Sequence, residues 1–272
     1  MGDLSGPQPK KSLGQHWLKD LAVLNAIADC AEIIPADTVL EIGPGLGTLT
    51  QVLAERADHV IAVEFDRDLA DSLQLQFPRV RPAGIGVGVD IINADFLDFD
   101  LSQMPTGYKI VGNIPYYITG KIVQKILTAA NKPAIAVLLV QKEVADRIVT
   151  GPGEMSILAV AAQYYADVEL GLFVPAAKFT PPPKVDSQVV ILRPRIASSE
   201  LAINEREFFH IVKAGFSQRR KKLRTALAGG LQISKQQAEQ LLKSADIDPN
   251  LRAQDLSLAD WKSLVIKYSH VN

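Results

Sequence analysis

Val-Leu-Glu-Ile-Gly-Pro-Gly-Leu-Gly-Thr, residues 39–48, is the stretch of the sequence that decides the fold. An apolar strand pattern runs to Ile42, glycines follow at positions 43, 45 and 47, and a helix pattern begins at Thr48. Glycines let the backbone turn sharply and approach a ligand closely, because no Cβ stands in the way. The stretch therefore predicts a strand–turn–helix unit whose turn binds a ligand.

The composition of this turn separates two kinds of cofactor. Its spacing is Gly-x-Gly-x-Gly, whereas dinucleotide-binding oxidoreductases carry Gly-x-Gly-x-x-Gly. Pro44 removes an amide N–H that a phosphate binder would use, and Glu41 places an acidic residue at the strand end. The turn favours a ligand without phosphate, such as S-adenosylmethionine. A glycine-rich turn alone is also compatible with an NAD-dependent oxidoreductase, but no catalytic Tyr-Lys or His arrangement accompanies it.

Two acidic residues follow the next predicted strands. Glu64 ends the strand after the turn, where a carboxylate can accept hydrogen bonds from both ribose hydroxyls of an adenosine group. Asp95 follows the third strand, where an acceptor can meet the adenine amino group. Both residues also suit helix capping and turn formation. Their place relative to the glycine turn favours cofactor binding.

The fourth strand leads into Gly-Asn-Ile-Pro-Tyr-Tyr, residues 112–117. The lone pair of adenine N6 is delocalised into the ring, so the amine becomes a better nucleophile when acceptors hold its two N–H groups. The side-chain carbonyl of Asn113 can be one acceptor. The backbone carbonyl of Ile114 can be the other, because Pro115 holds the preceding residue extended. Tyr116 offers an aromatic face for a flipped base. The motif predicts an adenine N6 methylation site, although it also suits a plain turn.

Strand and helix patterns alternate between residues 38 and 193. The strand candidates are Thr38–Ile42, Val60–Glu64, Asp90–Asn93, Tyr108–Gly112, Ala134–Val140, Ala166–Phe173 and Ser187–Leu192. The helix candidates are Thr48–Ala57, Asp66–Phe77, Thr119–Ala130, Lys142–Val149 and Ser156–Tyr165. This alternation predicts an α/β fold with a mostly parallel, seven-stranded sheet and helices on both faces. Only a short Pro-rich loop joins the last two strands, so they should pair antiparallel. The Gly-rich stretch Arg81–Gly88 is expected to be an irregular loop.

After Arg195 the strand signal stops and helix patterns follow. These are Asn204–Phe216, Arg219–Ala228, Ser234–Lys243 and Ser257–Tyr268, the last with a capping box formed by Ser257 and Asp260. They predict a small all-helical domain. Its basic residues gather between positions 206 and 224, with seven Lys or Arg against one acid. Such a cluster suits binding to a phosphate backbone, although charge runs are often only solvated faces.

The bulk composition agrees with a globular protein. Hydrophobic residues make up 47% of the 272 positions, and charged residues 22%. No stretch has the roughly 18 consecutive apolar residues of a membrane-spanning helix, and residues 1–11 lack the apolar core of a signal peptide. Cys30 is the only cysteine, and the four histidines are scattered, so no metal-site spacing occurs. We expect a cytoplasmic protein without metal or membrane attachment.

Seven motifs spread over nearly the whole chain resemble those of the ribosomal RNA adenine dimethyltransferases, of the bacterial small-subunit type. They are Lys11-Ser-Leu-Gly-Gln-His-Trp-Leu18, the glycine turn, Val63-Glu-Phe-Asp66, Asn93-Ala-Asp-Phe96, Asn113-Ile-Pro-Tyr116, Gln141-Lys-Glu-Val-Ala-Asp-Arg147 and Phe179-Thr-Pro-Pro-Pro-Lys-Val-Asp-Ser187. The resemblance implies a Rossmann-like class I methyltransferase domain over residues 1–195, which binds S-adenosylmethionine, and a helical RNA-binding domain over residues 196–272.

The resemblance also implies a reaction and its residues. The family dimethylates N6 of two adjacent adenosines in a hairpin loop near the 3′ end of 16S rRNA, in the assembling small subunit. The expected cofactor contacts are, from the turn, Glu41 and Gly45, and, from the resemblance, His16, Leu18, Gly43, Glu64, Asp95 and Asn113. The expected catalytic residues are Asn113, Ile114, Pro115, Tyr116 and Phe179, with Tyr116 and Phe179 on either side of the adenine. The expected RNA contacts are Lys213, Arg219, Arg220, Lys221, Lys222 and Arg224. We expect a monomer.

Some positions depart from the family pattern. Asn is common where this chain has His16, Phe is common at Leu13 and Trp17, and a smaller polar residue is usual at Tyr117. Two related interpretations of the same motifs are a 23S rRNA methyltransferase of the macrolide-resistance type and a non-catalytic RNA-binding factor on the same scaffold. The intact Asn113, Tyr116 and Phe179 favour an active enzyme.

Overall fold

The computed structural model describes residues 8–10, 13–78, 88–195 and 203–269. Contacts divide the chain into two compact units. We call them the sheet unit (Met1–Asp146 and Tyr165–Pro194) and the helical unit (Arg147–Tyr164 and Arg195–Asn272). Each unit has its own apolar core. The sequence predicts one boundary near residue 195, and the structure adds residues 147–164 to the helical unit.

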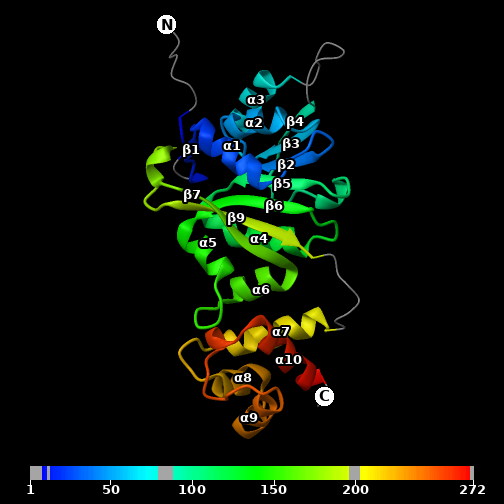
Figure 1. Cartoon of the computed structure of the whole chain (residues 1–272), viewed down its shortest axis with the longest axis vertical. Coiled ribbons are helices and arrows are strands. Elements are labelled where there is room, and N and C mark those ends of the chain that lie inside the picture. The colour runs from blue at the N-terminus through cyan, green and yellow to red at the C-terminus, as the bar shows by residue number, and fades with distance from the viewer. Residues whose placement is uncertain (1–7, 11–12, 79–87, 196–202, 270–272) are drawn as a thin grey trace. The chain divides into compact units, whose positions relative to one another are not determined.

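A seven-stranded sheet forms the centre of the sheet unit (Figure 1). Its strands in spatial order are β4 (Gly88–Asn93), β3 (His59–Glu64), β2 (Thr38–Ile42), β5 (Lys109–Asn113), β6 (Ile135–Gln141), β9 (Ser187–Pro194) and β7 (Ala166–Val174). The first five are parallel, and β9 pairs antiparallel with both β6 and β7. The predicted mostly parallel sheet and its antiparallel last pair are confirmed. Of the stretch 81–88, only Gly88 lies within the described residues.

Helices cover both faces of this sheet (Figure 1). They are α1 (Leu21–Cys30), α2 (Thr48–Ala54), α3 (Arg67–Gln76), α4 (Thr119–Thr128) and α5 (Lys142–Val149). The first three join the strands in one apolar cluster, to which they contribute Leu24, Leu53 and Leu73. Because β2 lies between β3 and β5, the chain leaves the sheet in opposite directions from β2 and β5, which opens a crevice at their carboxyl ends.

A second, two-stranded sheet was not predicted. β1 (Trp17–Leu18) pairs antiparallel with β8 (Phe179–Thr180). The hydroxyl of Thr48, the first residue of α2, donates to the backbone carbonyl of Leu18 at 2.9 Å. These contacts fix the N-terminal segment against the sheet unit beside the glycine turn.

The helical unit contains α6 (Ile157–Tyr165), which joins its core, and α7 (Glu205–Phe216), α8 (Leu223–Leu231), α9 (Lys235–Ser244) and α10 (Leu258–Ser269). The predicted capping box is present, since Asp260 N–H donates to Ser257 Oγ at 3.1 Å and Ser257 N–H donates to Asp260 Oδ2 at 2.8 Å. The predicted start of the helix at Arg219 is wrong, because residues 217–222 form a turn before α8. In the part of the chain described, no helix is long and apolar enough to cross a membrane.

Candidate active site

A pocket of about 310 Å³ lies in the sheet unit, at the carboxyl ends of β2, β3, β4 and β5. Five segments far apart in the sequence build its wall: residues 13–18, 41–49, 63–65, 94–97 and 113–118. Ligands of open α/β sheets bind in this position. All the residues predicted to bind the cofactor lie in this wall. They are His16, Leu18, Glu41, Gly43, Gly45, Glu64, Asp95 and Asn113.

The glycine turn has the backbone form that its composition requires. Gly43, Gly45 and Gly47 have φ of +67°, +59° and +77°, in the region that side chains rarely adopt. Gly47 also has no room for a side chain, since a Cβ there would lie 2.7 Å from Leu73 Cδ2. The N–H of Gly45 donates to Glu64 Oε2 at 3.0 Å, which joins the turn to β3.

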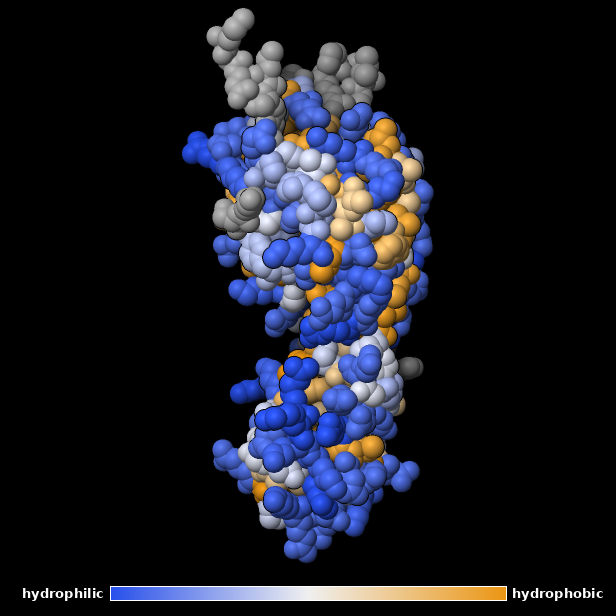
Figure 2. Space-filling view, turned by 90° about the vertical axis from the view of Figure 1, so that its left-hand side faces the viewer, coloured by the Kyte–Doolittle hydropathy of each residue, from blue (hydrophilic) through white to orange (hydrophobic). Residues whose placement is uncertain are grey.

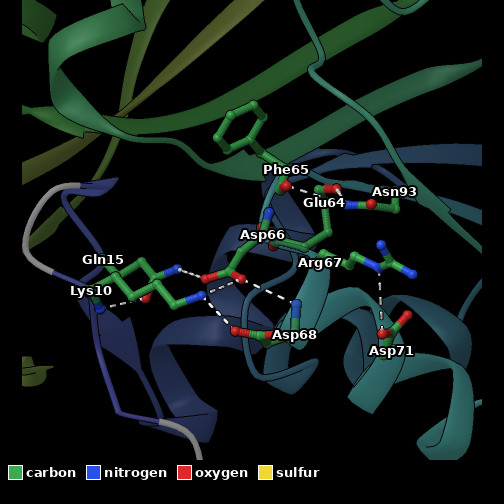
Figure 3. A network of polar contacts seen from close by, with 9 residues as sticks. All are labelled: Lys10, Gln15, Glu64, Phe65, Asp66, Arg67, Asp68, Asp71 and Asn93. Carbon is green, nitrogen blue, oxygen red and sulfur yellow. Dashed lines mark hydrogen bonds and ion pairs between the residues drawn. The ribbon is translucent and has the colours of Figure 1, made fainter.

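Glu64 lies at the end of β3 and is 6% exposed. Burial raises the pKa of its carboxyl, against the opposing effect of hydrogen bonds from the Asp66 and Gly45 N–H groups. The first of these measures 2.8 Å to Oε1 (Figure 3). Each carboxylate oxygen therefore has a backbone donor and keeps a further lone pair for a ligand hydroxyl.

Glu41 differs from Glu64 in its surroundings. It is 1% exposed, and neither carboxylate oxygen has a hydrogen-bond partner among the described residues. Burial raises its pKa to about 8, against an opposing effect of the nearby Thr50 hydroxyl, and the Glu64 carboxylate adds to the rise. A carboxyl with this pKa is protonated at neutral pH, so Glu41 contributes to the wall as a neutral group.

The end of β4 contributes Asp95, which is partly exposed in the pocket wall. Its Oδ1 accepts from the Leu97 N–H at 2.8 Å. The neighbouring Asn93 donates to the backbone carbonyls of Glu64 at 2.9 Å and Phe65 at 3.2 Å, which ties the ends of β3 and β4 together. Phe65 is 60% exposed and lines the pocket, although the sequence alone did not single it out.

Asn113, the last residue of β5, points its side chain toward the N-terminal segment. Its Nδ2 donates to the backbone carbonyl of His16 at 3.3 Å. This bond uses the amide nitrogen and leaves Oδ1 available as an acceptor. Ile114 and Pro115 also line the pocket, and Pro115 has the extended φ and ψ of −59° and 131°.

Tyr116 follows in a short 3₁₀ turn (Tyr116–Ile118), and its hydroxyl is 2.6 Å from Ser187 Oγ, which fixes the ring. Burial raises the pKa of this phenol. The His16 ring lies nearly parallel to it, with the ring centroids 6.0 Å apart and an angle of 19° between the planes. Tyr117, in contrast, is 65% exposed at the pocket wall.

Phe179 is not brought into the pocket wall. It is 3% exposed and belongs to the apolar cluster of the sheet unit. Its backbone pairs with Leu18, and the Nδ1–H of His16 donates to the carbonyl of the nearby Pro181 at 2.8 Å. The aromatic ring parallel to Tyr116 is therefore that of His16.

The basic cluster lies on the helical unit. Lys213, Arg219, Arg220, Lys221 and Lys222 are exposed, and Arg224 is partly buried. Arg224 forms an ion pair with Glu239 at 3.3 Å, and Lys222 donates to Asn250 at 2.8 Å. The side chains of Arg219, Arg220 and Lys221 form no ion pair with any residue that the structure describes. On the face in Figure 2, the part formed by α7–α10 is mostly hydrophilic.

Among the residues that the structure describes, no group of three or more His, Cys, Asp or Glu side chains is placed to hold a metal ion. The single described cysteine, Cys30, is a free thiol whose pKa is raised by burial. The site accordingly consists of carboxylates, amides and aromatic rings around a glycine turn.

The sheet order, the glycine turn and the pocket at the strand ends are those of a Rossmann-like class I methyltransferase. Among solved structures, the chain is similar to the 23S rRNA methyltransferase ErmE, with a TM-score of 0.72 and 28% identity over 93% of this chain and 99% of that chain. It is also similar to a dimethyladenosine transferase from Plasmodium falciparum, with a TM-score of 0.77 and 25% identity over 94% and 98% of the two chains.

Sequence comparison identifies the family. The model of the family "Ribosomal RNA adenine dimethylase" matches residues 6–270. A ribosomal RNA small subunit methyltransferase A of Desulfitobacterium hafniense is 43% identical, over 95% of this chain and 92% of its own. One of Dehalococcoides mccartyi is 42% identical, over 96% and 88%. The chain belongs to the ribosomal RNA adenine dimethylase family, which confirms the resemblance seen in the motifs.

Proposed function

We propose that this protein transfers methyl groups from S-adenosylmethionine to N6 of two adjacent adenosines in the 3′-terminal hairpin loop of 16S rRNA, giving dimethyladenosines during assembly of the small subunit. The observation that carries the proposal is Asn113-Ile-Pro-Tyr116, which lies at the end of β5 in the wall of the same pocket as the glycine turn. The names of the most similar relatives support the small subunit as the substrate.

The pocket fits S-adenosylmethionine. Glu64 keeps a lone pair on each oxygen for the ribose hydroxyls, and Asp95 is placed to accept from the adenine amino group. The positive φ angles of Gly43 and Gly45 bring bare backbone to the pocket, and Pro44 offers no N–H for a phosphate. His16, Leu18 and Glu41 complete the proposed wall around the amino-acid end of the cofactor.

The chemistry rests on alignment. When bound, S-adenosylmethionine supplies a methyl group already activated by its sulfonium. Asn113 Oδ1 accepts one N–H of the target amine, and the backbone carbonyl of Ile114, held extended by Pro115, accepts the other. Two acceptors draw the nitrogen toward tetrahedral geometry, and the fixed position of the amine lowers the barrier for transfer.

Tyr116 stacks on the flipped base, with its ring held by the hydroxyl contact to Ser187. The resemblance assigns the opposite face of the base to Phe179. Because Phe179 is 3% exposed, that role requires the covering residues to move aside, whereas His16 already faces Tyr116. In this proposal, Phe179 takes the opposite face of the base once the residues that cover it have moved aside.

In this proposal, the helical unit binds the phosphate backbone of the RNA. Arg219, Arg220 and Lys221 are exposed cations without an ion pair to the described residues, so they are available for phosphates. Lys213, Lys222 and Arg224 extend the same basic cluster. We infer that the protein acts as a monomer in the cytoplasm, where bacterial small subunits are assembled.

The direct experiment incubates the purified protein and labelled S-adenosylmethionine with small subunits that lack the modification, and separately with 23S rRNA. We expect label in N6-dimethyladenosine of the 16S 3′ hairpin. Label in 23S rRNA would show that the similarity to ErmE extends to its substrate, and absence of transfer to either RNA would favour a binding factor on a methyltransferase scaffold.

A further inference from the structure

Asp66 joins the N-terminal segment to the proposed ribose site. We call residues 8–10 and 13–18, which the structure describes, the strap. Asp66 follows β3, two positions after Glu64, and is 5% exposed. A buried carboxylate needs donors on its oxygens to offset the lost hydration. The residues that supply these donors indicate which part of the protein Asp66 holds in place.

Two of the donors come from the strap (Figure 3). Lys10 Nζ lies 2.7 Å from Asp66 Oδ1, and Gln15 Nε2 donates to Oδ2 at 3.0 Å. The backbone N–H of Lys10 donates to Gln15 Oε1 at 2.7 Å, so the two strap residues are also joined to each other. Lys10 reaches Asp68 at 2.7 Å as well. Hydrogen bonds from Lys10 and Gln15 keep the pKa of Asp66 below its ordinary value, although burial opposes them.

Capping of α3 does not account for this arrangement. As the N-cap residue, Asp66 accepts from the Asp68 N–H at 3.2 Å, and this bond uses only Oδ1. The partner of Oδ2 among the described residues is Gln15 of the strap. The backbone N–H of Asp66 donates to Glu64 Oε1, so one residue holds the strap with its side chain and the proposed ribose carboxylate with its backbone.

The strap in turn forms part of the pocket wall. Leu13, Gly14 and Gln15 line the pocket together with His16, Trp17 and Leu18. The other end of the strap is held by the pairing of β1 with β8 and by the bond from Asn113 to the His16 carbonyl. Asp66 therefore holds this wall at Lys10 and Gln15, and β8 and Asn113 hold it at residues 16–18.

We infer that Asp66 is a positioning residue which, through Lys10 and Gln15, holds the strap as a wall of the cofactor site and so sets the affinity for S-adenosylmethionine. The inference rests on the proposed function, since it takes that cofactor as the ligand of the pocket. It adds Lys10, Gln15 and Asp66 to the residues on which cofactor binding depends.

Asp66→Asn separates this role from capping. Asn is also a good N-cap and keeps the backbone N–H that holds Glu64, but it removes the charge and the second acceptor oxygen. We expect the Kd and KM for S-adenosylmethionine to rise about tenfold, with kcat at saturating cofactor within about twofold of wild type, as expected for loss of a charge-assisted hydrogen bond used in binding. The thermal midpoint should change little.

Lys10→Met tests the same interaction from the strap side, at a residue whose change leaves the buried core intact. It should weaken cofactor binding in the same direction, and the two losses should be less than additive in the double variant, because both changes break the ion pair of Lys10 with Asp66, although Lys10→Met also removes the exposed contact with Asp68. Asp71→Asn is the matched control. Asp71 is an exposed carboxylate on α3 that pairs only distantly, at 3.9 Å, with Arg67, so its variant should bind as wild type does.

Several results would overturn the inference: an unchanged Kd in Asp66→Asn, full additivity of the two changes, an equal loss in Asp71→Asn, or a loss confined to kcat. Calorimetry on the wild-type protein keeps this separate from the proposed function. If the wild type fails to bind S-adenosylmethionine, the proposed cofactor is wrong and the inference falls with it. If wild type and Asp66→Asn bind equally well, only the inference is wrong.

Discussion

The polar groups of the pocket differ in how their hydrogen-bonding capacity is used. Glu64 has one backbone donor on each oxygen, and Asn113 uses its nitrogen on the His16 carbonyl and keeps its oxygen. Tyr116 is held by Ser187. Glu41 lies in the same pocket wall, and neither of its carboxylate oxygens has a partner among the described residues. At the residue scale, the first three are prepared to contact a ligand, and Glu41 is a buried neutral acid.

Glu41 should make stability depend on pH. Its folded pKa of about 8 lies above the ordinary value of 4.5, so between these values the folded protein keeps a proton that the unfolded chain has released. Stability contributed in this way is complete below the lower value and falls as pH rises through the window, by up to about 1.4 kcal/mol per pH unit. Glu41→Gln should remove the part of this fall that Glu41 contributes and leave the part due to the raised pKa of Glu64, measured by urea unfolding without cofactor. The exposed Glu55→Gln should keep the whole fall, and a wild-type slope retained in Glu41→Gln would refute the assignment.

Tyr116 should matter through its ring more than through its hydroxyl. Tyr116→Ala should lower kcat/KM for RNA about 5- to 150-fold, which corresponds to the loss of about 1–3 kcal/mol from one stacked base. Tyr116→Phe keeps the ring and removes only the hydroxyl that meets Ser187, so its loss should stay below about tenfold. Steady-state kinetics on small subunits would measure both. Equal losses in the two variants would mean that stacking is not the function of Tyr116.

At the scale of elements, the sequence predicted the strands well because each parallel strand is a short apolar run that ends before a turn or an acidic residue. Thr38–Ile42 was predicted to the residue, and the others to within about two positions. β1 and β8 were not found, since strands of two residues have no periodicity. The start of α8 was placed too early, because charged residues suit a helix surface and no side-chain cap marks the true start at Leu223.

Two glycines with similar φ angles show how much stability depends on the close packing of the glycine turn. Gly47 has φ of +77° and would bring a Cβ to 2.7 Å from Leu73 Cδ2 and 2.9 Å from Phe77 Cε2. Gly107 has a similar φ of +81° with no atom within 4 Å of a Cβ. Gly107→Ala should therefore cost only the backbone strain, about 1–2 kcal/mol, and Gly47→Ala should cost about 1–3 kcal/mol more from overlap. Urea unfolding measures both, and equal costs would show that the turn adjusts freely.

At the scale of the whole molecule, the α/β class, the helical C-terminal region and the family were predictable from the sequence. The set of segments that come together to form the pocket was harder to predict from the sequence. Of residues 13–18, only His16 and Leu18 were assigned to it, and only through the family resemblance, because a short irregular segment carries no periodic signal. Trp17, Phe65 and the ion pair of Lys10 with Asp66 became visible only in three dimensions. The grouping of residues 147–164 with the later helices likewise depends on tertiary packing around the Phe208 and Trp261 core.

The basic cluster should bind RNA by charge. Replacing Arg219 and Lys221 with Gln should weaken binding to small-subunit RNA and lower the slope of log K against log salt by about 0.7–0.9 for each phosphate that the protein no longer neutralises. Cofactor affinity should stay unchanged. Lys235→Gln with Lys267→Gln removes the same charge from other exposed positions of the helical unit and serves as the control. If the two pairs lower the slope equally, net charge alone explains the binding.

The central claim is that Asn113 holds the target amine for transfer, and Asn113→Ala tests it most directly. The variant should lose about 10²–10³-fold in kcat, the range for removing one preorganised hydrogen-bonding group, while calorimetry still measures binding of S-adenosylmethionine. Gln124→Ala, which truncates an exposed amide on α4 outside the pocket, should keep full activity. Methyl transfer to small subunits at the wild-type rate by Asn113→Ala would contradict the account.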